Sequence, residues 1–171
     1  MSPATTDELF GHLDALGIAH HTTWHEPVFT VAESQALRGS LPGGHSKNLF
    51  LKNKKGDLWL VTAAEDAAVD LKALTKTLEA GRLSFGKPDL LMEVLGIEPG
   101  SVTPFALIND PHHRVTFVLD QRLAVMEPLH FHPLTNRATT AVSPNDFAKF
   151  LTNSGHQAIA LAFPAAGEAL A

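Results

Sequence analysis

Lys47 is the residue whose surroundings most directly suggest chemistry. In residues 46–52 it alternates with Leu49 and Leu51, and alternate residues of a β-strand share a face. A cation on an apolar face is unfavourable unless it is paired, often with an anionic ligand. The spacing therefore predicts a cation directed into a pocket. The alternative is a lysine whose stem follows the strand while its amine reaches solvent.

Residues 100–104, with the sequence GSVTP, are a second candidate. Gly100 lets the main chain approach a ligand closely, and Pro104 stiffens the exit from the loop. Rigid backbone amides and carbonyls of this kind can bind hydroxyls or stabilise an oxyanion. The same five residues also suit an ordinary turn, so the pattern alone leaves both interpretations open.

Residues 130–136, with the sequence HFHPLTN, form a third candidate. On a strand, His130 and His132 would face the same side. No His-Glu-x-x-His pattern and no nearby carboxylate accompanies them, so no metal site is expected. His132 is predicted to line a substrate pocket, and the alternative is a histidine that simply hydrogen-bonds to the backbone.

The elements that would position these residues follow from capping signals, apolar spacing and turn residues. Helices are expected between Thr5 and Gly17, Thr30 and Gly39, Asp70 and Gly81, Leu90 and Gly96, and Ser143 and Gly155. Strands are expected over residues 46–52, 58–64, 82–85, 105–108, 115–119 and 157–163.

These elements mix without the regular alternation of a doubly wound fold. We therefore predict an α+β fold, with a curled, partly barrel-like mixed β-sheet flanked by helices. The 171 residues suit one domain spanning residues 1–171, and the small, apolar tail over residues 164–171 is expected to fray.

Several classes of protein are excluded or disfavoured by what the chain lacks. It contains no cysteine, which excludes a thiol nucleophile, a disulfide framework and a cysteine-containing zinc site. No nucleophile elbow, phosphate-binding loop or dinucleotide fingerprint is present, so no cofactor is expected. The first residues lack the features of a signal peptide, and no apolar run is long enough to span a bilayer. We therefore expect a cytoplasmic protein without a membrane partner.

The formal net charge of -5 means that any nucleic-acid binding must come from a local patch. Four of the thirteen lysines and arginines lie within nine positions: Lys47, Lys52, Lys54 and Lys55. The alternative interpretation is a lysine-rich hairpin tip that stays solvated and resists edge pairing.

Five motifs occur in order: GGHSKNLFLKNKKG at 43–56, LWLV at 58–61, GSVTP at 100–104, LIND at 107–110 and FHPLTN at 131–136. Together they resemble the YbaK/prolyl-tRNA-synthetase-associated editing domain family, and most closely its free-standing alanyl-tRNA(Pro) deacylase branch. The resemblance runs from about Leu9 to Phe163. It implies a barrel-like mixed sheet, hydrolysis of an aminoacyl ester on transfer RNA by water, and neither metal nor covalent intermediate.

The resemblance also implies roles for individual residues. Lys47 would position the terminal nucleotide, and the main chain of Gly100 and Pro104 would hold the ribose and the ester. His132 would shape the amino-acid pocket. Further substrate contacts are implied for Asn48, Asn136, Lys52 and Arg82, the last two toward the acceptor stem. Asn53 departs from the aspartate that is frequent at its position.

The expected substrate is therefore alanine wrongly attached to proline tRNA, with prolyl-tRNA synthetase as a potential partner. Two other interpretations stay open. The same fold could act on cysteinyl-tRNA(Pro) or another mischarged tRNA, or the chain could be a non-catalytic tRNA-binding or regulatory protein.

Overall fold

The structure is a computed structural model that describes residues 2–27 and 43–164. The elements are, in order, α1 (Thr6–Ala15), β1 (His21–Trp24), β2 (Gly44–Lys52), β3 (Leu58–Ala64), α3 (Leu71–Leu78), β4 (Ser84–Phe85), α4 (Pro88–Leu95), η1 (Pro99–Ser101), η2 (Pro104–Asn109), β5 (Val115–Asp120), η3 (Leu123–Val125), β6 (Leu129–Phe131), β7 (Ala138–Val142), α5 (Pro144–Ser154) and β8 (Ala158–Leu161). The helix predicted after Thr30 lies outside the described residues, as does the predicted tail beyond residue 164.

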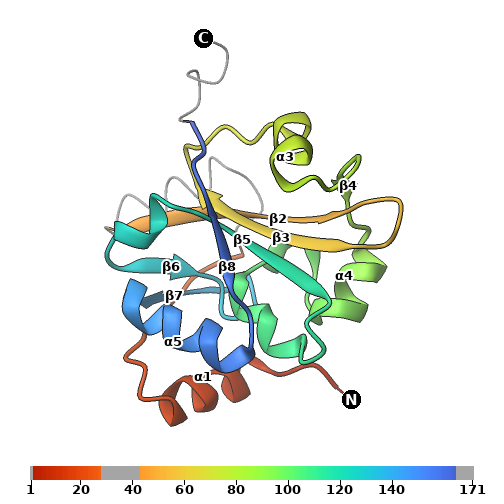
Figure 1. The fold of residues 1–171 in the computed structure, drawn as a ribbon. Helices are drawn as coiled ribbons and strands as arrows, with labels where there is room; N and C mark the ends of the chain where they lie inside the picture. The colour runs from red at the N-terminus through yellow and green to blue at the C-terminus, as the bar shows by residue number, and fades with distance from the viewer. Residues whose placement is uncertain (1, 28–42, 165–171) are drawn as a thin grey trace.

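The strands of the described part form one mixed sheet in the order β1-β7-β6-β2-β3-β5-β8, with β4 alongside β2 (Figure 1). The pairs β2–β6, β3–β5 and β5–β8 are parallel, and the others are antiparallel. The sheet curls but does not close, so the predicted α+β class with a partly barrel-like sheet is confirmed. Within residues 2–27 and 43–164, no helix is long and apolar enough to cross a bilayer.

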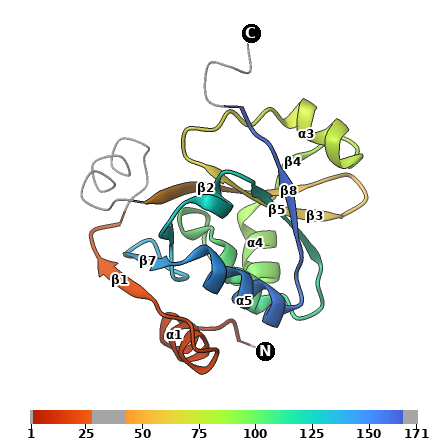
Figure 2. The same cartoon turned by 60° about the vertical axis from the view of Figure 1, so that its left-hand side comes forward.

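Helices cover both faces of the strands β2, β3 and β5. The main core lies on the side of α1, α4 and α5, and it includes edge-to-face contacts of Phe105 with Phe131, Phe147 and Phe150. A smaller outer cluster lies under α3, on the opposite side (Figures 1 and 2). Because both faces are covered, every residue of β3 is buried, which explains its nearly continuous apolar sequence.

The helix starts follow the predicted capping chemistry. Thr5 and Glu8 form a capping box at α1, and the Ser143 side chain accepts a hydrogen bond from the amide of Asp146 at the start of α5. Gly155, with φ +82, ends α5 in the left-handed conformation.

The strand predicted over residues 105–108 is wrong. These residues belong to the 3-10 helix η2, which begins with Pro104 after the Thr103 side chain accepts a hydrogen bond from the amide of Phe105. Phe105, Ala106 and Leu107 are all buried. A short, continuous apolar run does not distinguish a buried strand from a buried helical turn, and here the proline and its cap determine the helix.

A buried histidine–aspartate pair joins the segment after α5 to the end of η2. His156 Nε2 lies 2.9 Å from Asp110 Oδ2, and the carboxylate also accepts hydrogen bonds from the amides of Arg114 and Val115. Burial raises the pKa of Asp110, but the hydrogen bonds from His156 and the two amides outweigh burial and lower it. The stabilisation is therefore present above the ordinary aspartate pKa and is lost as pH falls through the lowered pKa.

Ser154 Oγ lies 2.9 Å from His156 Nδ1, so serine, histidine and aspartate follow one another in a chain of hydrogen bonds. The imidazole and the carboxylate are buried, and Ser154 Oγ also donates to the carbonyl of Leu151. A nucleophilic serine needs an accessible oxygen and a base that can take its proton. The arrangement therefore ties two elements together and does not form a hydrolase triad.

Asn53 links the β2–β3 turn to the segment after α3. Its Nδ2 donates to Asp57 Oδ2 and to the carbonyl of Ala80, at 3.0 and 2.8 Å, and its Oδ1 accepts from the Asp57 amide. The side chain is buried and uses both donor and acceptor groups. The departure from aspartate at this position therefore has a structural reason, since a carboxylate could not donate to either oxygen.

Asn53→Asp should lower the free energy of unfolding by about 1–3 kcal/mol, because it leaves the Ala80 carbonyl unpaired and places two carboxylates together. Urea denaturation at neutral pH measures the change. Adding Asp57→Asn restores a donor between residues 53 and 57 and should recover part of the loss. Equal stability of Asn53→Asp and the unmodified chain would contradict this assignment.

Candidate functional site

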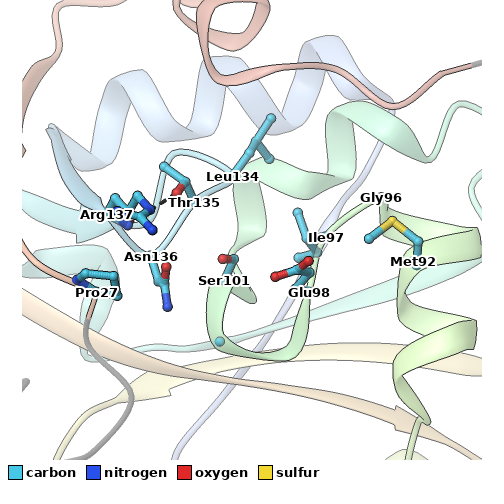
Figure 3. A pocket seen from close by; sticks show the side chains of 11 residues that line it. Pro27, Met92, Gly96, Ile97, Glu98, Ser101, Leu134, Thr135, Asn136 and Arg137 are labelled. Atoms are coloured by element: carbon cyan, nitrogen blue, oxygen red, sulfur yellow. Dashed lines mark hydrogen bonds between the residues drawn. The ribbon is translucent and has the colours of Figure 1, made fainter.

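A pocket of about 410 Å³ lies between the chain that follows α4 and the loop that follows β6 (Figure 3). This volume is within the range of about 300–1,000 Å³ that is typical of small-molecule sites. Its lining combines apolar, polar and charged residues: Pro27, Met92, Gly96, Ile97, Glu98, Gly100, Ser101, Leu134, Thr135, Asn136 and Arg137.

The first wall is shaped by the way α4 ends. Gly96 adopts φ +66 and packs so closely on Pro3 that a Cβ would lie 2.3 Å from the Pro3 ring. The chain then turns through η1, where the amide of Ser101 donates to the carbonyl of Glu98 at 2.9 Å. This turn buries Ser101 and leaves Glu98 and Gly100 exposed at the pocket.

The second wall is the loop from residue 132 to residue 137. The Thr6 hydroxyl of α1 donates to the carbonyl of Pro133 at 2.8 Å, and Leu134 follows with φ +67. At the other end, the amide of His25 donates to the carbonyl of Arg137 at 2.9 Å. The loop is therefore tied to α1 and to the segment after β1, although few of its own residues lie in regular structure.

The pocket presents opposite charges from its two walls. Glu98 comes from the first wall and Arg137 from the second, with Ser101 and Asn136 between them (Figure 3). Ile97 and Leu134 supply apolar surface. The arrangement suits a ligand that carries both charges together with an apolar part. Among residues 2–27 and 43–164, no cluster of metal-ligating side chains is present.

Two of the residues predicted from sequence, Gly100 and Asn136, meet in this pocket. Lys47 does not line it. Lys47 shares a face of β2 with Leu49 and Leu51, as its spacing predicts, but this is the face of the outer cluster. The half-buried amine donates a hydrogen bond to the carbonyl of Ala67. The lysine is thus held by the backbone after β3 and is not simply turned out to solvent.

Asn48 points to the opposite face of β2. Its Oδ1 accepts a hydrogen bond from Thr62 Oγ1 at 2.6 Å, across the β2–β3 pair. Pro104 is buried as the first residue of η2. The pocket lining includes neither residue.

Lys52 and Arg82 lie at one corner of the sheet. Lys52 ends β2 and pairs with Ser84 of β4, which follows Arg82 by two positions. Arg82 is exposed and Lys52 is half-exposed, so a large polyanion can reach both cations. They lie apart from the pocket lining.

His132 follows β6 directly and is half-buried, and it is not among the residues that line the pocket. Nδ1 lies 2.9 Å from the carbonyl of Ala138, so the neutral ring carries its proton on Nδ1. Burial has the largest effect on the pKa of His132 and lowers it. The hydrogen bond to the carbonyl of Ala138 raises the pKa, and His25, whose ring lies 6.5 Å away, lowers it further. His25 itself contacts Thr139 Oγ1 at 2.8 Å. The imidazole is therefore neutral at physiological pH.

The sequence interpretation missed two charged residues that line the pocket, Glu98 and Arg137, and one residue beside His132. Glu98 lies two positions before Gly100, and Arg137 follows Asn136, so each was adjacent to a recognised motif. His25, far from His132 in sequence, carried no signal of its own. The tertiary pairing of β1 with β7 is what brings the two histidines together.

Comparison with known proteins gives one family and several relatives. The family model described as "Aminoacyl-tRNA editing domain" matches residues 25–150. A Bos taurus protein named prolyl-tRNA synthetase associated domain-containing protein 1 is 42% identical over 156 residues, covering 88% of this chain and 91% of the relative. The prolyl-tRNA editing protein ProX of Acetoanaerobium sticklandii is 34% identical over 145 residues, covering 84% and 88%.

Solved structures share the fold at low identity. A proposed trans-editing enzyme for prolyl-tRNA synthetase superposes with a TM-score of 0.68 at 20% identity, covering 95% of this chain and 99% of that one. A hypothetical protein superposes with a TM-score of 0.72 at 18% identity, covering 91% and 97%. These structures support the mixed, curled sheet described above.

The environment of His132 predicts that its pKa lies below the ordinary histidine value of about 6.5. NMR titration of the ring resonances measures it directly. His25→Gln removes the imidazole whose electrostatic interaction lowers the pKa of His132, so that pKa should rise relative to the unmodified chain. A pKa at or above 6.5 in the unmodified chain would contradict the burial and orientation of the ring.

Proposed function

We propose, from the premise that the chain belongs to the aminoacyl-tRNA editing domain family, that it removes alanine wrongly attached to proline tRNA. The chain is an aminoacyl-tRNA hydrolase of the editing class, and its substrate is a tRNA. The identity of the amino acid and of the tRNA is our proposal. Relatives whose names refer to prolyl-tRNA synthetase and to prolyl-tRNA editing support the tRNA assignment.

The observation that carries the proposal is the meeting of Gly100 and Asn136 in one pocket. They belong to two motifs that lie far apart in the chain and that both resemble the editing family. The pocket of about 410 Å³ is larger than an alanine side chain requires. Its size is compatible with the terminal nucleotide and its attached amino acid together.

Hydrolysis needs only modest catalytic assistance from the protein, because an aminoacyl ester is already activated. Water adds to the ester carbonyl carbon, and negative charge develops on the carbonyl oxygen. The intermediate then collapses, and the ribose oxygen leaves with a proton. Catalysis requires orientation of water and ester and stabilisation of the developing charge. The accessible main chain at Gly100 is suited to both tasks.

The family resemblance, and not the pocket lining, suggests that Lys47 holds the terminal nucleotide, because Lys47 lies outside the pocket lining. A lysine amine is a compact charge on a flexible stem, so it can exchange a backbone carbonyl for a phosphate. Its hydrogen bond to Ala67 would then be the arrangement without substrate. We also propose that His132 shapes the amino-acid pocket as a neutral group, and that Pro104 stiffens the loop beside Gly100.

A physical need for such an enzyme follows from the limits of recognition by size. A synthetase pocket for proline cannot strongly reject the smaller alanine, since each methylene group that is missing from a substrate is worth only about 1–3 kcal/mol. A second site that admits alanine and excludes proline completes the selection. In this proposal the acceptor end of the mischarged tRNA is the partner, prolyl-tRNA synthetase generates the substrate, and the reaction takes place in the cytoplasm.

The proposal predicts a clear order of substrates. When the protein is incubated with alanyl-, cysteinyl- and prolyl-tRNA(Pro), loss of the alanyl ester should be fastest and the prolyl ester should persist. Release of labelled amino acid measures each rate. Fastest loss of the cysteinyl ester would favour the same enzyme with a different specificity. Binding without loss of any ester would favour a non-catalytic tRNA-binding protein.

Lys52 and Arg82 should contribute to tRNA affinity by neutralising phosphates. The variants Lys52→Ala and Arg82→Ala should each weaken binding and reduce the slope of log affinity against log salt by about 1, the value expected for one phosphate. Binding titrations at several salt concentrations measure the slope. Lys149→Ala is a matched control, because that exposed lysine pairs with Asp146 on α5. An unchanged slope in both variants would place the acceptor stem elsewhere.

A further inference from the structure

Glu98 is a charged residue of the pocket that the described part of the fold does not use. Its carboxylate lines the cavity, and within residues 2–27 and 43–164 it takes part in no ion pair or side-chain hydrogen bond. Glu98 stands at the N-cap position of η1, yet its side chain does not cap that turn. Glu93, by comparison, pairs with Arg114 at 3.5 Å. The exposed Glu98 carboxylate is therefore available to a ligand in the pocket.

The chemistry of the proposed substrate supplies a partner of opposite charge. Every aminoacyl-tRNA carries a free α-amino group, which is largely protonated at neutral pH. This ammonium is attached to the carbon beside the ester carbonyl, so it lies next to the bond that breaks. Glu98 lies two residues before Gly100, whose main chain is the proposed site of the ester. A carboxylate at this place can bind the ammonium while the ester is held at the loop.

Resting on the proposed function, we infer that Glu98 binds the α-ammonium group and makes the enzyme select tRNA that carries a single unblocked amino acid. An acylated amine has no positive charge, so it cannot form a charge-assisted hydrogen bond with the exposed carboxylate. The enzyme therefore discriminates against peptidyl-tRNA and other N-blocked esters. Arg137, on the opposite wall, matches the phosphodiester of the same terminal nucleotide in charge.

The test compares alanyl-tRNA(Pro) with N-acetylalanyl-tRNA(Pro) under single-turnover conditions. The unmodified enzyme should prefer the free amine. Glu98→Gln keeps the size of the side chain and removes its charge, so it should reduce that preference roughly tenfold to a hundredfold, the equivalent of one charged hydrogen bond. The loss should fall on the alanyl ester, with the N-acetylalanyl ester almost unaffected.

Two further variants separate recognition from structure. Glu98→Asp keeps the charge on a shorter stem and should retain more of the preference than Glu98→Gln. Glu93→Gln removes a carboxylate on the same segment outside the pocket and should leave both rates unchanged. Thermal unfolding checks that all three variants fold.

The inference is overturned if Glu98→Gln slows both esters equally, or if it leaves the preference for the free amine intact. Neither result would contradict the proposed function, because the unmodified enzyme would still release alanine. Failure of the unmodified enzyme to hydrolyse alanyl-tRNA(Pro) would instead overturn the proposed function, and this inference with it.

Discussion

The strand β2 is the constraint on which the rest of the structure depends, because its two ends pair with different parts of the sheet. Its first residues, Gly44 and His45, pair in parallel with β6, whereas residues 46–52 pair with β3. Backbone donors and acceptors must be satisfied when buried, so β2 joins β6 and β7 on one side to β3 and β5 on the other. Close packing reinforces this junction, since a Cβ on Gly44 would lie 2.8 Å from Met126.

This junction explains how loops of little regular structure can form a defined pocket. The loop after β6 is carried to its place by the pairing of β6 with β2, and its ends are tied to α1 and to the segment after β1. The opposite wall is set by the turn after α4, where Gly96 packs on Pro3. Loops held at both ends by a rigid scaffold can vary in sequence while keeping their geometry, which is why binding residues often lie there.

The buried polar groups differ from the exposed charged groups that line the pocket. Asp110, His156 and Asn53 satisfy one another or the backbone, and each links elements that are distant in sequence. Glu98 and Arg137 instead present charge to the pocket without a structural partner in the described part of the chain. Buried polar groups stabilise a fold only when they are paired, whereas charged groups left accessible in a cavity are available to a ligand.

Local sequence alone was sufficient for most of the elements. The caps at Thr5, Asp70 and Ser143 predicted helix starts, and the nearly continuous apolar run of residues 58–64 predicted a buried strand. These signals depend only on neighbouring residues. The run over residues 105–108 was misread because burial on all sides is compatible with either a strand or a helical turn. The motifs around Gly100 and Asn136 were also visible in the sequence.

Tertiary structure alone decided which of these residues meet. The pairings of β6 with β2 and of β1 with β7 bring Asn136 to the pocket of Gly100 and His25 to His132, across separations that no local pattern encodes. It also directed the amine of Lys47 to the Ala67 carbonyl and placed the Glu98 carboxylate at the cavity. Strand spacing specifies the face on which a side chain lies, but its partner depends on what the rest of the chain packs against that face.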